Sequence, residues 1–306
     1  MAKYARKHHY ISAGYLAGFA VPEARDCVFY VFDLNTRRIR QATPESEAWA
    51  YDYHRIDKSG IAPDYFDKIL AQFEGAVPAA IKALDKNPMC SEDDFAVLLG
   101  FIALTAVRTP FFRDGFTRQT ELELQLPFEE AVGKAEHWTN LEQWLSKVDT
   151  DWTHEDTIRL QTDQTHAKVR VQASYFFHML MHWSTLSDLL AERSWSVLIP
   201  YGKDDFFICS DNPVGLESPA MEMGDTPLFT DRQSILTFPL NRRLALIGRF
   251  DEEPFTAEVG REMIARMNMQ TLRRATRCLY APKNTAIGMQ KDGSVGYLQD
   301  ILSLIK

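Results

Sequence analysis

The sequence predicts an α+β fold in which a mixed or antiparallel sheet packs against a large central helical block. Three observations lead to this class. Short apolar runs rich in β-forming residues lie near both ends of the chain, and a long stretch with helical periodicity separates them. Strands and helices do not alternate regularly, so a doubly wound parallel sheet has no support.

The first zone, residues 1–62, contains a predicted β-hairpin. Residues 27–32 form an apolar strand, residues 33–36 are typical of a turn, and residues 37–41 return as a second strand. We expect this hairpin to share one sheet with strands near the other end of the chain.

The second zone, residues 63–193, has helical periodicity nearly throughout. Its first helix begins at Pro63, and its apolar residues recur at intervals of three and four. Pro78 is expected to bend or divide this helix, because proline lacks the backbone N–H that a helix interior uses. Further helices are predicted over residues 113–135, 140–148 and 164–193.

The longest uncharged apolar run of the chain, residues 95–107, lies within this zone. Ser91 and Asp94 resemble a capping box at the start of the helix that contains it, and Thr109 with Pro110 ends that helix. A membrane span needs ~20 apolar residues, so we expect a buried helix and no membrane partner.

The third zone, residues 194–306, is rich in strands. Strands are predicted over residues 195–200, 206–209, 235–240, 244–248 and 278–281, and a helix over residues 256–277. No linker, repeat or low-complexity tract separates the zones, so we expect residues 1–306 to form one composite domain.

Composition excludes several classes of protein. The 306 residues are 45% hydrophobic and 25% charged, which excludes disordered, collagen-like and disulfide-scaffold chains. Four scattered cysteines without zinc spacing favour reduced thiols, and no apolar segment follows the basic N-terminus, so we expect a cytoplasmic protein. The net charge of −8 argues against a generally basic nucleic-acid-binding surface. The P-loop, dinucleotide-binding and nucleophile-elbow motifs are missing from the sequence.

Two adjacent imidazoles in a basic, aromatic segment are the first candidate site residues. His8 and His9 follow Lys7 and precede Tyr10. In an extended segment, neighbouring side chains point to opposite sides, so at most one of the two faces a site as an acid, base or ligand. The alternative is that both are ordinary polar residues of the terminus.

A polar segment at the end of a predicted strand is the second candidate. Asp211 could bind a divalent metal or act as a general base, Ser210 could donate a hydrogen bond, and Asn212 could orient a substrate. The alternative is an Asx-type turn in which these side chains bond their own backbone, and the residue types alone favour that turn.

Charged residues in the helical block leave further alternatives open. Arg108 either stabilises the end of its helix or reaches a site as an anion clamp. Glu74 is either a solvated helix residue or an acid that points inward. His178 and His182 have a spacing that can chelate zinc, but no glutamate completes the motif, so core histidines are favoured.

Several of these motifs occur along the chain in the same order as in one known protein family. The His8-His9-Tyr10 opening, the Arg108-Thr109-Pro110 helix end and the Ser210-Asp211-Asn212-Pro213 segment resemble a bacterial family of proteins of unknown function, DUF4238, over nearly the whole chain. Further matches are Tyr51-Asp52-Tyr53, Glu74, Trp195 to Leu198, Pro239-Leu240 and Asn268. The resemblance implies that His8 or His9, Arg108 and Asp211 belong to one constellation.

From these residues we expect a metal-dependent, nuclease-like hydrolase that acts on a phosphate-bearing substrate such as a nucleotide or nucleic acid. Asp211 would hold the metal or act as base, Arg108 would neutralise charge, and His8 or His9 would move a proton. The substrate would contact Ser210, Asn212, Glu74 and Asn268. The alternative is a non-catalytic regulatory module that binds a ligand or a protein. A role as a toxin or phage-defence effector is compatible with the enzyme.

Overall fold

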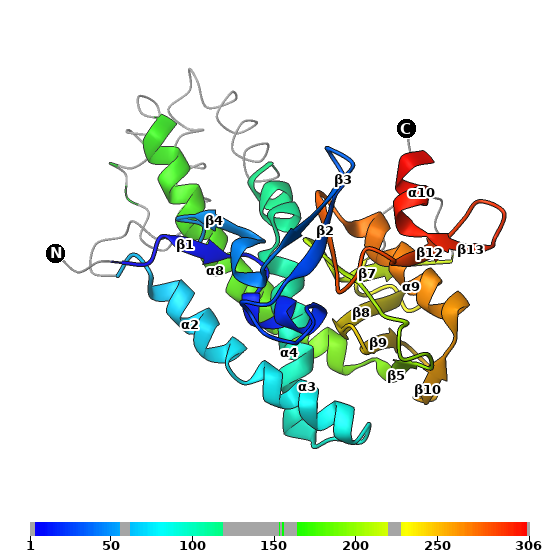
Figure 1. The fold of residues 1–306 in the computed structure, drawn as a ribbon. Coiled ribbons are helices and arrows are strands. Elements are labelled where there is room, and N and C mark those ends of the chain that lie inside the picture. Colours follow the sequence, from blue (N-terminus) through cyan, green and yellow to red (C-terminus); the bar gives the residue numbers. More distant parts are fainter. Residues whose placement is uncertain are drawn as a thin grey trace.

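The computed structural model describes residues 4–55, 62–118, 153, 155, 164–219 and 228–304, and Figure 1 shows how they are arranged. Long helices lie in the middle of the molecule, and the two larger sheets lie beside them. The predicted α+β class is confirmed.

The N-terminal region holds two small antiparallel elements. Strand β1 (Lys7–His9) pairs with β4 (Trp49–Tyr51), so that His8 lies opposite Ala50. The predicted hairpin between them is confirmed as β2 (Phe29–Asp33) and β3 (Arg38–Ala42). A short helix, α1 (Ala13–Leu16), follows β1.

The helical block contains α2 (Tyr65–Glu74), α3 (Val77–Lys86), α4 (Glu92–Arg108) and α8 (Gln164–Ala191). Pro78 lies in the first turn of α3, so the chain is divided there, as predicted. Among the described residues, no single helix is both long and apolar enough to cross a membrane. The predicted segment 140–148 and most of 113–135 lie outside the described residues.

Helix α4 is the centre of the core. The Ser91 hydroxyl accepts a hydrogen bond from the Asp94 backbone N–H at 3.1 Å, which confirms the predicted cap. The helix is buried over most of its length and packs against α3 and α8. Thr109 is extended at its C-terminus, and a second helix, Pro110–Arg118, starts at an angle of 52°.

One sheet joins the two ends of the chain in the order β3-β2-β11-β6. Strand β11 (Cys278–Ala281) pairs antiparallel with both β2 and β6 (Cys209–Ser210). The prediction that the N-terminal hairpin shares a sheet with C-terminal strands is therefore confirmed.

The second large sheet has the order β10-β5-β9-β8-β7. Its strands are β5 (Ser194–Pro200), β7 (Gly215–Glu217), β8 (Ile235–Asn241), β9 (Leu244–Arg249) and β10 (Thr256–Val259). Strands β10 and β5 are parallel and the other pairs are antiparallel, so the sheet is mixed.

The predicted helix over residues 256–277 is wrong at both ends. Residues Thr256–Val259 form β10, because they find a partner at the edge of β5, and α9 (Arg261–Arg274) starts only after Gly260. Residues 206–208, predicted as part of a strand, are not in β6, because the side chain of Asn268 takes up the Ile208 N–H. A hairpin of β12 (Ile287–Met289) and β13 (Val295–Tyr297) and the helix α10 (Leu298–Leu304) follow β11.

Candidate functional site

A cavity of about 200 Å³ lies between the first strand, helix α2 and the end of helix α4. One face of α2 forms its wall, because Asp67, Leu70, Ala71 and Glu74 are spaced at three, four and seven residues and so lie above one another. The other lining residues are Lys7, His9, Ser12, Ala13, Arg25, Glu45, Gly75 and Arg108. We call this the inner cavity.

Arg108 is the buried cation of the inner cavity, with a side chain that is 1% exposed. Its Nη2 lies 2.5 Å from Oε1 of Glu74, and its Nε donates a hydrogen bond to the carbonyl of Tyr10 at 3.0 Å. The hydroxyl of Tyr53 donates to the backbone carbonyl of Arg108. The first two contacts hold Nε and Nη2 of the guanidinium, and Arg108 lines the inner cavity.

His9 and Lys7 lie on the same side of β1, two residues apart, and both bond to the backbone carbonyl of Glu45. Burial lowers the pKa of His9, and the nearby charges of Lys7 and Arg108 act in the same direction. The imidazole of His9 is therefore neutral near pH 7 and can accept a proton.

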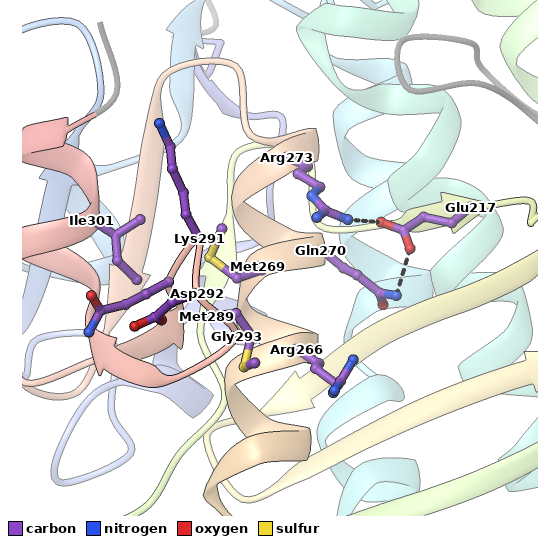
Figure 2. Close-up of a pocket in the computed structure, with 11 residues that line it drawn as sticks. Glu217, Arg266, Met269, Gln270, Arg273, Met289, Lys291, Asp292, Gly293 and Ile301 are labelled. Carbon is purple, nitrogen blue, oxygen red and sulfur yellow. Dashed lines mark hydrogen bonds and ion pairs between the residues drawn. The ribbon is translucent and has the colours of Figure 1, made fainter.

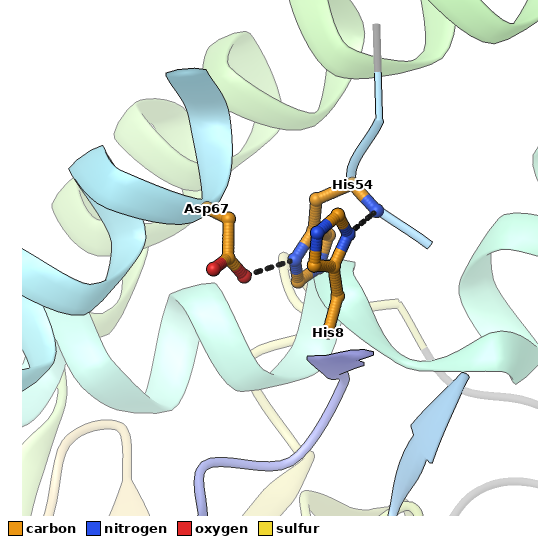
Figure 3. Close-up of side chains that lie close together, drawn as sticks. All are labelled: His8, His54 and Asp67. Atoms are coloured by element: carbon orange, nitrogen blue, oxygen red, sulfur yellow. Dashed lines mark hydrogen bonds and ion pairs between the residues drawn. The ribbon is translucent and has the colours of Figure 1, made fainter. Parts of the chain in front are cut away.

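His8 points to the other side of β1 and is buried against His54 (Figure 3). Nδ1 of His8 accepts a hydrogen bond from the backbone N–H of His54 at 2.8 Å, and its Nε2 lies 3.0 Å from the carbonyl oxygen of Ala5. Nδ1 of His54 lies 3.2 Å from Oδ1 of Asp67, which lines the inner cavity. Asp67 is thus bonded to His54, and His54 in turn stacks on His8.

The charges in this His8–His54–Asp67 cluster follow from burial. Burial lowers the pKa of His54 to about 4, so the ring is neutral and its Nδ1–H donates to the carboxylate. Burial by itself would raise the pKa of Asp67. The hydrogen bond from His54 and the charge of Arg108 together outweigh burial, so the pKa of Asp67 is lowered. Nε2 of His54 is buried and has no hydrogen-bond partner among the described residues.

The cluster has the residue types of a metal centre, since one donor atom from each side chain lies within 4.8 Å of the others. The arrangement does not fit a shared ion. The two rings are stacked and inclined by only 8°, and a metal must lie in the plane of each imidazole that binds it, ~2 Å from the nitrogen. Nδ1 of His8 also uses its lone pair on the backbone of His54, which leaves the proton on Nε2. We therefore interpret the cluster as a hydrogen-bonded support for Asp67.

The second candidate segment lies in the sheet that joins the chain ends, at the end of β6. The carboxylate of Asp211 accepts hydrogen bonds from the backbone N–H of Thr276, at 2.9 Å, and from its hydroxyl. Ser210 accepts from the Asn212 N–H, and the Asn212 amide donates to the carbonyl of Arg274. Burial raises the pKa of Asp211. Among the described residues, Asp211 belongs to no group of three metal-donor side chains.

Asn268 lies on α9 and is fully buried. Its amide oxygen accepts from the Ile208 N–H, and its amide nitrogen donates to the carbonyls of Phe206 and Ile287. These bonds join three backbone segments, so we assign Asn268 a structural role. The structure therefore places His9, Glu74 and Arg108 around one cavity, with His8 behind it. Asp211 lies in a hydrogen-bonded turn, and Asn268 lies on α9.

Two other regions of the structure contain histidines or charged side chains. The rings of His178 and His182 on α8 lie against Phe116 and Phe112, respectively, and His182 is exposed. A cavity of about 1270 Å³ lies between α9, the β12–β13 hairpin and α10 (Figure 2). Both of its acids already have partners, since Glu217 is bonded to Arg273 and Gln270, and Asp292 accepts hydrogen bonds from Ser294.

No sequence pattern predicted His54 and Asp67 as site residues. They are 13 residues apart in the sequence and neither lies in a local motif, so only the fold brings them together. The alternation of side chains along β1 was the one available signal, since it places His8 on the side opposite His9.

A family model described as a protein of unknown function (DUF4238) matches residues 7–285 of the chain. The match includes β1, the inner cavity and the Ser210 to Pro213 segment, and it ends before the β12–β13 hairpin. No curated protein and no solved structure is similar enough to count as a match.

Proposed function

The chain belongs to the DUF4238 family of proteins of unknown function, and we propose that it is a hydrolase that cleaves a phosphate-bearing substrate in the inner cavity. The observation that carries this proposal is Arg108. A buried guanidinium that lines a cavity is suited to bind a phosphate there, since its fork geometry matches phosphate oxygens.

The residues around Arg108 supply the remaining chemistry of a hydrolysis. Neutral His9 takes a proton from the attacking water as the water oxygen bonds to phosphorus, and the bond from phosphorus to the leaving oxygen breaks. Arg108 stabilises the charge that develops on the phosphoryl oxygens. The proton that His9 took from the water passes to the leaving oxygen, which is released as an alcohol, and His9 returns to its neutral form.

Two further features agree with a nucleotide-sized substrate. The ionised carboxylate of Asp67 lines the cavity, and oxygen ligands of this kind suit Mg²⁺ or Mn²⁺. A second cavity of about 680 Å³ shares Ser12, Arg25, Glu74 and Gly75 with the inner cavity, so a substrate larger than a phosphate has room beside it.

The test is a substrate panel with the purified full chain. Nucleotides, single-stranded and double-stranded nucleic acids and p-nitrophenyl phosphate esters are incubated with added Mg²⁺, Mn²⁺ or Zn²⁺, and with a chelator. We expect turnover of at least one substrate, a loss of roughly 100-fold in Arg108→Lys and a similar loss in His9→Gln.

Two matched variants control for general effects of substitution. Arg266→Lys and His182→Gln change exposed side chains outside the inner cavity and should leave turnover unchanged. A folded wild-type protein that is inert across the panel would overturn the proposal, as would full activity in Arg108→Lys.

A further inference from the structure

Another cavity, of about 320 Å³, is lined by the C-terminal part of helix α4, and it shares no described lining residue with the inner cavity. Its walls are mainly apolar, with Val107, Phe112, Leu186, Val214, Leu216 and Phe229 among them. The volume is at the lower end of the range for small-ligand pockets, ~300–1,000 Å³. We call this the apolar pocket.

Arg274 is the one arginine, lysine or acidic residue among the described residues that line the apolar pocket. Among the described residues, its buried Nε has no hydrogen-bond partner and its guanidinium makes no ion pair. The neighbouring carboxylate of Glu217 is bonded to Arg273 and Gln270 instead. Burial lowers the pKa of Arg274, and the charge of Glu217 compensates for this only in part.

A cation in apolar surroundings is unfavourable when it loses water without gaining a counter-ion, and the described residues supply no counter-ion to Arg274. The backbone around it is nevertheless fixed. The Asn212 amide, which also lines the pocket, donates to the carbonyl of Arg274 at 3.0 Å. A ligand with an anionic head would supply the missing counter-ion.

The mouth of the pocket is apolar as well. Phe111 and Leu228 are 52% and 68% exposed and both line it. Exposed large apolar side chains around a cavity favour an apolar ligand body, since binding removes their surface from water.

We propose that the apolar pocket binds a small amphipathic carboxylate, such as a medium-chain fatty acid, with its head on Arg274 and its chain against α4, α8 and β7. The apolar walls select the chain, and the guanidinium of Arg274 selects the carboxylate. Asn212, at the edge of the pocket, offers an amide to the second carboxylate oxygen. The site is separate from the inner cavity, so its test does not depend on the proposed hydrolase activity.

The experiment measures binding of octanoate and of octanol to the full-length protein by isothermal titration calorimetry. The two probes have the same chain length and differ in the head group. We expect octanoate to bind at least 10-fold more tightly than octanol. Arg274→Met, which removes the charge and keeps an unbranched side chain, should weaken octanoate at least 10-fold and leave octanol unchanged.

Two further variants make the result specific. Ala106→Phe places a ring in the pocket from α4 and should weaken both probes at least 10-fold. Arg273→Met removes a neighbouring guanidinium that is exposed and bonded to Glu217, and should bind both probes like the wild type.

A second measurement covers the case in which Arg274→Met does not fold. The NMR titration of octanoate labelled with ¹³C at its carboxyl should show a lower carboxyl pKa when the ligand is bound to the wild type than when it is free. Three results would overturn the proposal: no octanoate binding at millimolar concentration, equal affinity for octanoate and octanol, or wild-type affinity in folded Arg274→Met.

Discussion

Replacement of Glu74 by glutamine removes the carboxylate that lies 2.5 Å from Nη2 of Arg108 and changes the size of the side chain very little. At an effective dielectric constant of about 20, two unit charges at this distance attract each other by about 6–7 kcal/mol, and much of this offsets the loss of water around both groups. Removal of one partner from a buried pair costs ~3–5 kcal/mol. Since Glu74 is 17% exposed and partly hydrated, we expect Glu74→Gln to lower the free energy of unfolding by about 3 kcal/mol.

Urea unfolding followed by circular dichroism gives this free energy for the wild type, Glu74→Gln, Arg108→Met and the double variant. The double variant should lose less than the two single variants together, because it leaves no unpaired charge in the core. Arg266→Met is the matched control. It breaks the exposed pair with Glu262, four residues away, and should cost less than about 0.5 kcal/mol. A loss below about 1 kcal/mol in Glu74→Gln, or additive losses in the double variant, would refute the reasoning.

Three further predictions concern the buried polar groups. Burial lowers the pKa of His54 from 6.5 to about 4, so its contribution to stability is complete above about pH 6.5 and is lost as the pH falls toward 4, up to about 3 kcal/mol. Between about pH 7 and about pH 5, the free energy of unfolding in urea should fall more in the wild type than in His54→Gln. Equal losses in the two proteins would contradict this. Asn268→Ala leaves three backbone groups without partners and should cost about 3 kcal/mol or more in chemical unfolding, whereas a cost below about 1 kcal/mol would mean that water replaces the amide. Asp211→Asn weakens the hydrogen bonds to Thr276 and should destabilise the protein by about 1–2 kcal/mol, while turnover of the phosphate substrate by the folded variant should be unchanged. Loss of turnover in a stable variant would mean that Asp211 belongs to the active site.

The sequence predicted those structural elements that are determined by residues close together in the chain. The Ser91 cap, the division of the chain at Pro78 and the β2–β3 hairpin depend on neighbouring residues, and the structure has all three. Strand β10 was missed because its pairing with β5 comes from a distant segment, and a four-residue strand has too little pattern of its own.

The candidate site shows the same division. His9, Glu74 and Arg108 stand out by residue type, and the structure gathers them around one cavity. His54 and Asp67 have no pattern in the sequence, because what joins them is a hydrogen bond between a loop and α2. The Ser210 to Pro213 segment was the clearest polar motif in the sequence. In the structure, Ser210 bonds to the backbone of Asn212, and Asp211 bonds to Thr276. A polar motif at the end of a strand can therefore be required by the turn itself.

The pairing of β2 with β11 has a consequence for synthesis of the chain on the ribosome. Phe29 and Val31 of β2 are fully buried in the finished protein, but the strand that covers their edge is β11, at residues 278–281. At ~5–20 residues per second, the hairpin waits roughly 10–50 s for this partner. During that time its edge can pair with other chains, so chaperone binding to nascent chains and the insolubility of fragments that end before residue 278 should both depend on this hairpin.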